Sequence, residues 1–184
     1  DVKFANLDGS EDGKITADDR TILGYKKENF RMSFGNTFRY KDFELYMLFT
    51  GIFGGNGYGQ AVNYYAFRTS SDVQGDNNFN HGWWTPENKS NKYPRINYTD
   101  GRYTPLQGYG FVRLQDLSLS YTFRQPWVQK AGIGNLKVYM ACKNLFTISG
   151  WEGGDPEVQQ TLGSGYTYGY PLSRTVSFGL NLTF

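Results

Sequence analysis

The chain has 184 residues, a net charge of +2 and an aromatic content of 18%, yet its mean hydropathy is −0.59. The small net charge argues against a nucleic-acid-binding surface. A single cysteine, Cys142, excludes a disulfide framework, and a single histidine, His81, removes most histidine-based catalysis and metal chemistry. No apolar run is long enough for a transmembrane helix. An aromatic-rich but hydrophilic chain is typical of strands that are apolar on one face and are joined by polar loops.

In chain order, the sequence predicts five β-strands and one short helix. Residues 1–29 are polar and rich in Asp and Gly. Apolar residues then recur at every second position in five segments, which is the period of a β-strand. The predicted strands cover 30–40, 43–53, 111–123, 136–147 and 174–184. A short helix is predicted at 127–131. Segments 54–108 and 149–172 have no sustained period and are predicted to be long loops, although the first is long enough to hide short strands.

The last predicted strand has the sharpest pattern, and two architectures produce it. Its apolar residues alternate with small or polar ones and end on Phe184. Such a strand belongs either to an outer-membrane barrel or to a soluble sandwich with one buried face. Five strands of this kind, with aromatic residues near their ends and with alternating short and long connections, favour the barrel. We therefore predict an all-β fold that forms an antiparallel transmembrane β-barrel segment with long extracellular loops.

Five strands are too few to close a barrel. About eight strands are the minimum for a closed barrel with a filled interior, and an open sheet edge is not tolerated in lipid. Either segment 54–108 contributes further strands, or the chain is part of a larger barrel. The polar start of the chain favours the larger barrel.

Several short motifs follow one another along nearly the whole chain. They are DGSEDGKITADDR at 8–20, ILG at 22–24, FGNTFRYKDF at 34–43, WWTPEN at 83–88, YPR at 93–95, FVRLQDLSLSY at 111–121, KNLF at 143–146, GGDPE at 153–157 and YPLSRT at 170–175. Each motif is weak alone, but their order and spacing are specific. Together they resemble the C-terminal part of a SusC/RagA-type TonB-dependent outer-membrane transporter.

This resemblance implies a 22-stranded barrel in the bacterial outer membrane, with an N-terminal plug, a TonB-contacting segment and a SusD-like lipoprotein lid. The family imports glycans or peptides with energy relayed by TonB. Residues 30–184 would form about the last five strands, and residues 1–29 an extracellular loop. The expected partners are the remaining barrel and plug, the SusD-like lid, the TonB complex through the absent N-terminal part, and outer-membrane lipid. We expect neither enzymatic activity nor a nucleic-acid partner. The alternatives are a secreted all-β glycan-binding module with a structural calcium loop, and a small closed barrel that acts as an adhesin.

Residues 8–19 fit the twelve-residue calcium-binding loop. Gly13 occupies the sixth position, where the chain bends sharply, and Ile15 is expected to be buried and to pin the loop. The predicted ligands are Asp8, Ser10, Asp12, the Lys14 carbonyl, Thr16 and Asp19. Ser10 and Asp19 replace stronger ligands, so we predict a structural Ca²⁺ site of modest affinity that braces an extracellular loop. The alternative is a turn held by side-chain-to-backbone hydrogen bonds without an ion.

Aromatic and amide side chains are dense in segment 54–108. Tyr64, Tyr65, Trp83 and Trp84 are candidates for contact with a substrate or with the lid, because aromatic rings stack on sugars while amides bind hydroxyl groups. The alternative for these residues is packing within the loop. Asp155 and Glu157 flank a proline, and we expect them to be solvated loop residues rather than a glycosidase pair.

Overall fold

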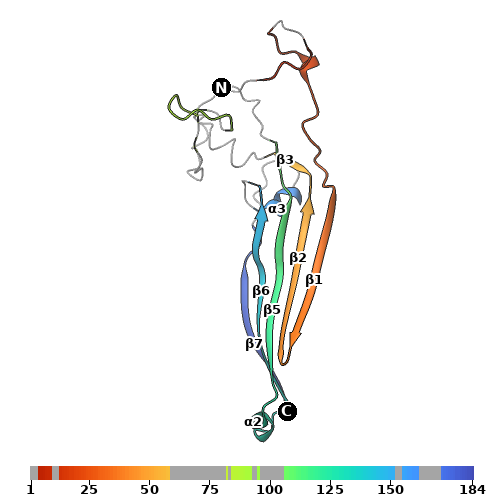
Figure 1. Ribbon diagram of the computed structural model, residues 1–184, viewed down its shortest axis with the longest axis vertical. Coiled ribbons are helices and arrows are strands. Elements are labelled where there is room, and N and C mark those ends of the chain that lie inside the picture. The colour runs from red at the N-terminus through yellow and green to blue at the C-terminus, as the bar shows by residue number, and fades with distance from the viewer. Residues whose placement is uncertain are drawn as a thin grey trace.

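The computed structural model describes residues 4–9, 13–58, 82, 84–92, 95, 106–151, 155–161 and 171–184. Its centre is one antiparallel sheet of five long strands in the order β1-β2-β5-β6-β7, shown in Figure 1. The strands are β1 (Phe30–Tyr40), β2 (Phe43–Phe53), β5 (Phe111–Phe123), β6 (Asn135–Ser149) and β7 (Thr175–Thr183). The predicted antiparallel arrangement of five strands is therefore confirmed.

The two ends of the sheet differ, and we name them the turn end and the loop end. The turn end holds the two-residue link Lys41-Asp42, helix α2 (Pro126–Lys130) and the last residue of the chain (Figure 1). Lys41 has φ 51°, as a tight reversal between paired strands requires. After α2, the N–H of Ile133 donates to the Val128 carbonyl at 3.1 Å, and that of Gly132 to the Gln129 carbonyl at 3.0 Å. These bonds form a Schellman motif, which ends the helix.

The loop end carries the short elements. These are the 3₁₀ turn η1 (Ala17–Asp19), the paired strands β3 (Asn56–Tyr58) and β4 (Leu106–Gly108), and helix α3 (Pro156–Thr161). Backbone bonds tie the N-terminal segment to this end, because the N–H of Asn29 donates to the Phe53 carbonyl and that of Asn56 to the Tyr25 carbonyl, each at 2.8 Å. The described residues of segment 54–108 include two short strands, which pair with each other and do not extend the main sheet.

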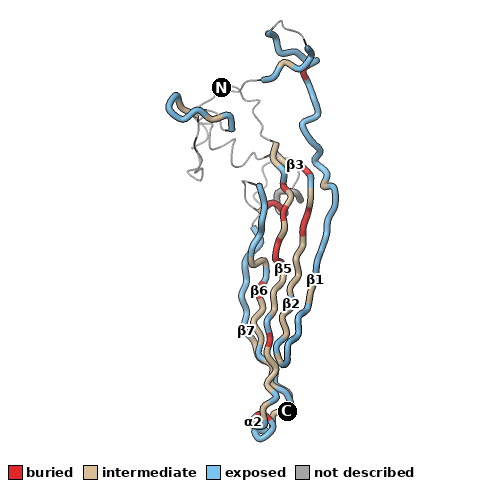
Figure 2. The backbone as a smooth tube through the Cα atoms, viewed as in Figure 1, coloured by how far each residue is buried: buried red, intermediate tan, exposed pale blue. Residues whose placement is uncertain are grey.

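Few of the described residues are buried. Figure 2 shows that buried residues gather toward the loop end, whereas the edge strands β1 and β7 are almost entirely exposed. Ile52, Tyr109 and Phe111 form a small cluster at the loop end, and Trp151 packs against it. The Tyr109 hydroxyl donates to the Lys26 carbonyl and so fixes the N-terminal segment to this cluster. None of the described helices is long and apolar enough to cross a membrane.

The strand boundaries follow the predicted ones closely. β1, β2 and β5 have the predicted limits, β6 extends one residue earlier and two residues later, and β7 lacks the first residue and the last residue predicted for it. The extension of β6 follows from its pairing, because Ser149 lies opposite Phe111, the first residue of β5. The predicted short helix is present at Pro126–Lys130.

Candidate functional site

The main sheet has one apolar and one polar face. Residues opposite one another in an antiparallel pair share a face, so the register assigns every strand position. Leu45, Leu119 and Met140 lie in one cross-strand row, and the row continues to Phe178 of β7. The neighbouring row on the other face contains Glu44, Ser120, Tyr139 and Gly179. The alternation read from the sequence is thus kept across the sheet.

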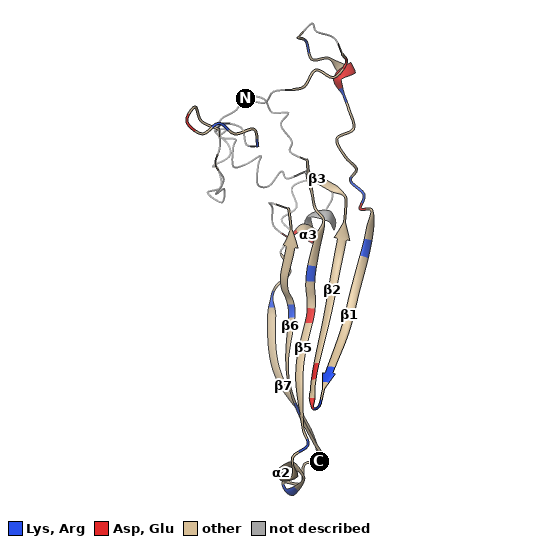
Figure 3. Cartoon of the chain, viewed as in Figure 1, with Lys and Arg blue, Asp and Glu red and all other residues tan. Residues whose placement is uncertain are grey.

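Every charged residue of the five long strands lies on the polar face. Figure 3 shows that most of the length of these strands carries no charge. The charged residues are Arg31, Arg39, Glu44, Arg113, Asp116, Lys137 and Lys143. Glu44 links three strands, because its carboxylate lies 2.6 Å from Arg39 Nε and 3.5 Å from Lys137 Nζ. An uncharged apolar face opposite a charged face is the arrangement of a strand between lipid and a polar barrel interior.

A β-bulge in β5 decides the face on which Arg113 lies. Leu48 and Phe49 are adjacent in β2, but they pair with Asp116 and Leu114, so Gln115 is an extra residue. Without this bulge, Arg113 would lie on the same face as Leu117 and Leu119. The bulge instead places Arg113 opposite Thr50 and Thr147, on the polar face.

Arg113 is almost fully buried and is held by three side chains. Its side chain is 2% exposed. Nε donates to Thr147 Oγ1 at 2.9 Å, Nη2 to Asp155 Oδ1 at 2.6 Å and Nη1 to Glu157 Oε2 at 2.6 Å. The Phe111 ring adds a cation–π contact, with Cζ 5.0 Å from the ring centroid. Removing one partner of a buried ion pair commonly costs about 3–5 kcal/mol.

The expectation that Asp155 and Glu157 are solvated loop residues is wrong for Asp155, whereas Glu157 lies in α3 and is partly solvated. Asp155 is 9% exposed and forms an ion pair with Arg113, as does the half-exposed Glu157. Asp155 Oδ1 also accepts the N–H of Glu157 at 3.0 Å, and its Oδ2 accepts the N–H of Leu172 at 3.3 Å. The ion pair with Arg113 accompanies the burial of Asp155, and the local sequence gives no sign of a partner more than forty residues away.

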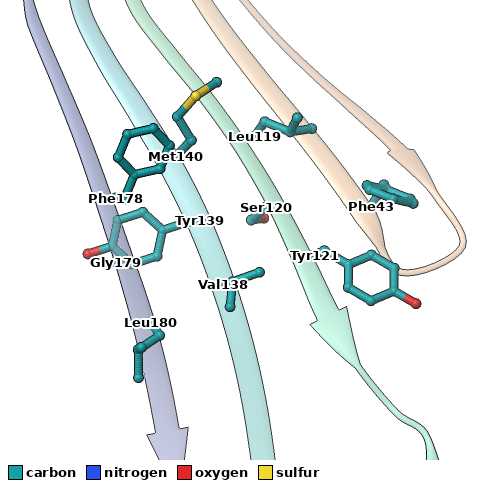
Figure 4. A pocket seen from close by; sticks show the side chains of 10 residues that line it. All are labelled: Phe43, Leu119, Ser120, Tyr121, Val138, Tyr139, Met140, Phe178, Gly179 and Leu180. Atoms are coloured by element: carbon teal, nitrogen blue, oxygen red, sulfur yellow. The ribbon is translucent and has the colours of Figure 1, made fainter.

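A groove of about 450 Å³ crosses β5, β6 and β7 near the turn end. Leu119, Val138, Met140, Phe178 and Leu180 line it from the apolar face, as Figure 4 shows. Phe43 and Tyr121 also line it and pack against each other with ring centroids 4.6 Å apart, and Phe123 packs against Trp127 at 5.9 Å. An apolar surface that ends in an aromatic cluster is typical of a strand end at a membrane boundary.

Asp19 organises the predicted calcium loop. Its carboxylate accepts backbone N–H groups of Leu7 at 2.6 Å, Asp8 at 3.1 Å and Thr16 at 2.7 Å. These bonds, led by that from Thr16, hold the pKa of Asp19 below its ordinary value. Two of the three N–H groups share Oδ1, so this oxygen has no further lone pair for a cation in this arrangement. The arrangement favours Asp19 as a clamp on the loop over Asp19 as a bidentate ligand.

The other predicted loop residues meet different outcomes. The expectation that Ile15 is buried is wrong, since its side chain is 50% exposed. Asp8, Lys14 and Thr16 lie in the described part of the loop, whereas Ser10 and Asp12 lie outside the described residues. Within the described residues, no group of three acidic, histidine or cysteine side chains could hold a metal ion. Calcium binding stays a prediction.

Trp84 is the one predicted aromatic contact residue that the structure describes, and it is half-buried. It precedes a turn in which Thr85 and Asn88 exchange backbone bonds of 3.1 Å. Tyr64, Tyr65 and Trp83 lie outside the described residues. Their proposed contact with a substrate or a lid stays a prediction. Cys142 is buried, at a position that the register assigns to the apolar face.

Comparison with known proteins identifies relatives over almost the whole chain. TonB-dependent receptor P3 of Formosa agariphila is 31% identical over 98% of this chain, and receptor P26 of the same organism is 28% identical over 96%. SusC of Bacteroides thetaiotaomicron is 34% identical over 40% of the chain. The resemblance to SusC/RagA-type TonB-dependent receptors is confirmed. No family model matches the chain.

Solved structures agree on the fold. The RagAB peptide importer in its open-open state matches 93% of the chain with a TM-score of 0.65 and 23% identity, and the closed-closed state gives 0.63. The chain spans 19% of the length of the two Formosa receptors and of the matched importer chain. The main sheet is thus a segment of a transmembrane barrel in the bacterial outer membrane, and it is open because five strands are a fraction of that barrel. The relatives are named as receptors and a transporter, not as enzymes.

Proposed function

We propose that this chain forms five adjacent strands in the wall of a TonB-dependent outer-membrane importer of glycans or peptides. One observation carries the proposal. The sheet separates all strand charges from an uncovered apolar face, in a chain that TonB-dependent receptors match from end to end. A soluble sandwich would have to cover the apolar face with a second layer. Among the described elements, no second sheet or helix packs on that face.

The proposed partners follow from the faces, edges and ends of the sheet. β1 and β7 are edge strands with no outer neighbour among the described strands, and they would pair with the remaining barrel. The plug would face the polar side, where the charged residues lie, and lipid would cover the apolar side. A SusD-like lipoprotein would act as a lid at the loop end. The TonB complex would act through a part of the transporter that does not belong to this chain.

The proposal is tested with the full-length transporter that contains this chain. A strain that lacks the transporter gene and the same strain complemented with that gene would be compared. Each would be given fluorescein-labelled maltooligosaccharides and, separately, a fluorescein-labelled tryptic digest of casein. We expect uptake of one probe in the complemented strain only, and loss of that uptake when TonB is deleted. Uptake that is equal in the deletion strain, or that does not depend on TonB, would contradict the proposal.

Purification distinguishes the proposal from a secreted glycan-binding module. We expect this sequence to be recovered from outer membranes only with detergent, as part of a much larger polypeptide, and together with a surface lipoprotein. Recovery of a soluble 21.0 kDa monomer without detergent would support the secreted module instead. Recovery of the large polypeptide without a lipoprotein would remove the lid from the proposal but leave the importer intact.

A further inference from the structure

Arg113 belongs to the polar face of the barrel wall, yet water does not reach it. Its guanidinium is enclosed by the Phe111 ring and by residues at the start of α3. A buried arginine is rare unless it is paired, and here two carboxylates and a hydroxyl occupy its Nε and both terminal nitrogens. These three partners therefore fix the orientation of the Arg113 guanidinium.

All three partners come from the β6–β7 side of the sheet. Thr147 belongs to β6, Asp155 immediately precedes α3, and Glu157 lies in its first turn. Asp155 also binds the N–H of Leu172, which precedes β7. One aspartate thus joins residues on either side of α3, and Arg113 joins this pair of chain segments to the middle strand of the sheet.

The bulge at Gln115 is what makes the cluster possible. It turns Arg113 toward the polar face at the loop end, where α3 lies in Figure 1. The cluster carries one positive and two negative charges, and Glu157 remains 46% exposed. The anchored segment therefore keeps a partly exposed carboxylate beside the polar face, at the end where the proposed importer would admit its substrate.

We propose that Arg113 is a positioning residue that holds α3 and Leu172 against the polar face of the barrel wall, so that α3 forms part of the surface that an entering substrate contacts. The contact with substrate rests on the proposed import function, whereas the anchoring of α3 does not. Without Arg113, the start of α3 loses its two ion pairs with β5, and α3 leaves the polar face.

The test uses the full-length transporter with a nitroxide at V158C in a C142A background. Three variants are compared with the parent: R113M, the neutral triple variant R113M/D155N/E157Q, and the control R39M, which removes an exposed arginine from the same face at the turn end. The measurements are the nitroxide line shape, uptake of whichever labelled probe the parent takes up, and the melting temperature of the barrel.

We expect R113M to change the nitroxide from an immobilised to a mobile line shape, to abolish most uptake and to lower the melting temperature, because two carboxylates lose their ion pairs with Arg113. The triple variant should recover the melting temperature but neither the line shape nor the uptake, since its charges are balanced while its anchor is still missing. R39M should match the parent in all three measurements.

Three results would overturn the proposal. An unchanged line shape in R113M would show that Arg113 does not hold α3. Recovery of uptake in the triple variant would show that charge balance matters and position does not. A mobile α3 with full uptake would remove the role in substrate contact. If the parent takes up neither probe, the import proposal fails instead, and the line shape alone decides whether Arg113 anchors α3.

Discussion

A single arginine placed at adjacent positions of β5 should have opposite consequences on the two faces. Leu117 is the central residue of β5 and lies on the apolar face, opposite Met47 and Cys142. Ser118 follows it and points to the polar face, opposite Tyr46 and Ala141. The variants L117R and S118R therefore place the new arginine on opposite faces of the sheet at nearly the same depth along the strand.

The free-energy cost of L117R follows from the depth of Leu117 in the bilayer. Leu117 has six residues of β5 on either side, which places it near the bilayer midplane. An arginine on the lipid-facing side at that depth costs about 2–4 kcal/mol, whereas near the boundaries the cost is about 0–1 kcal/mol. On the polar side, the S118R side chain can reach water and the carboxylate of Asp116, so we expect a change within about 0.5 kcal/mol.

The assay is urea unfolding of the full-length transporter in phospholipid vesicles, with the folded fraction measured by heat-modifiable gel mobility. L117R should lower the unfolding free energy by the amount given above, and S118R should leave the midpoint almost unchanged. Equal losses in both variants would mean that neither face meets lipid alone. A larger loss in S118R would reverse the assignment of the faces and refute the reasoning.

Three further predictions concern the connections. G132A should destabilise the α2 turn by about 1 kcal/mol, because Gly132 has φ 73° with open space around it; G150A, also in open space but without a positive φ, should be neutral in the same urea titration. Since the pKa of Asp19 is lowered in the folded loop, the stability it contributes is present above its unfolded pKa of about 4 and is lost as pH falls through the lower folded value. Amide exchange of residues 4–20, corrected for intrinsic rates, should accelerate in the parent as pH falls through this pKa. The D19N variant should show no such transition. Calorimetry should detect calcium at the 8–19 loop with a dissociation constant of about 10⁻⁴–10⁻³ M, and no binding heat at millimolar calcium would exclude the site.

The strands could be predicted because their signal is local. Alternation of apolar and polar residues needs only neighbours in sequence, and it gave the limits of β1, β2 and β5 without error. It also gave the face of each residue from Leu117 to Phe123. The resemblance to a family added what periodicity lacks, namely that the apolar face meets lipid rather than a second sheet.

The Arg113 cluster could not be predicted in the same way. Its register depends on an extra residue in β5, which is visible only when β2 is paired with it. One signal was present in the sequence, since unbroken alternation would put Arg113 on the apolar face, and a charge there is a contradiction that a bulge resolves. Its carboxylate partners lie 42 and 44 residues away, across a turn, a helix and a strand.

The N-terminal loop shows that one sequence motif can fit two different arrangements. The spacing of Asp8, Gly13 and Asp19 matches a calcium loop, and the same spacing lets Asp19 accept the N–H groups of Leu7, Asp8 and Thr16. Both arrangements need an acidic residue at the end of the turn. The sequence therefore predicts a closed loop with Asp19 at its centre. A calcium titration decides whether this loop binds the ion.

The central claim is that one face of this sheet meets lipid and the other a polar interior, and β7 tests it most directly. A nitroxide would be placed at each residue of Thr175–Thr183 in full-length C142A transporter in bilayers, and its relaxation measured with oxygen and with a water-soluble nickel chelate. Oxygen accessibility should peak at Val176, Phe178, Leu180 and Leu182 and fall at the residues between them. A profile without a two-residue period, or one in which the nickel chelate reaches those four positions, would contradict the account.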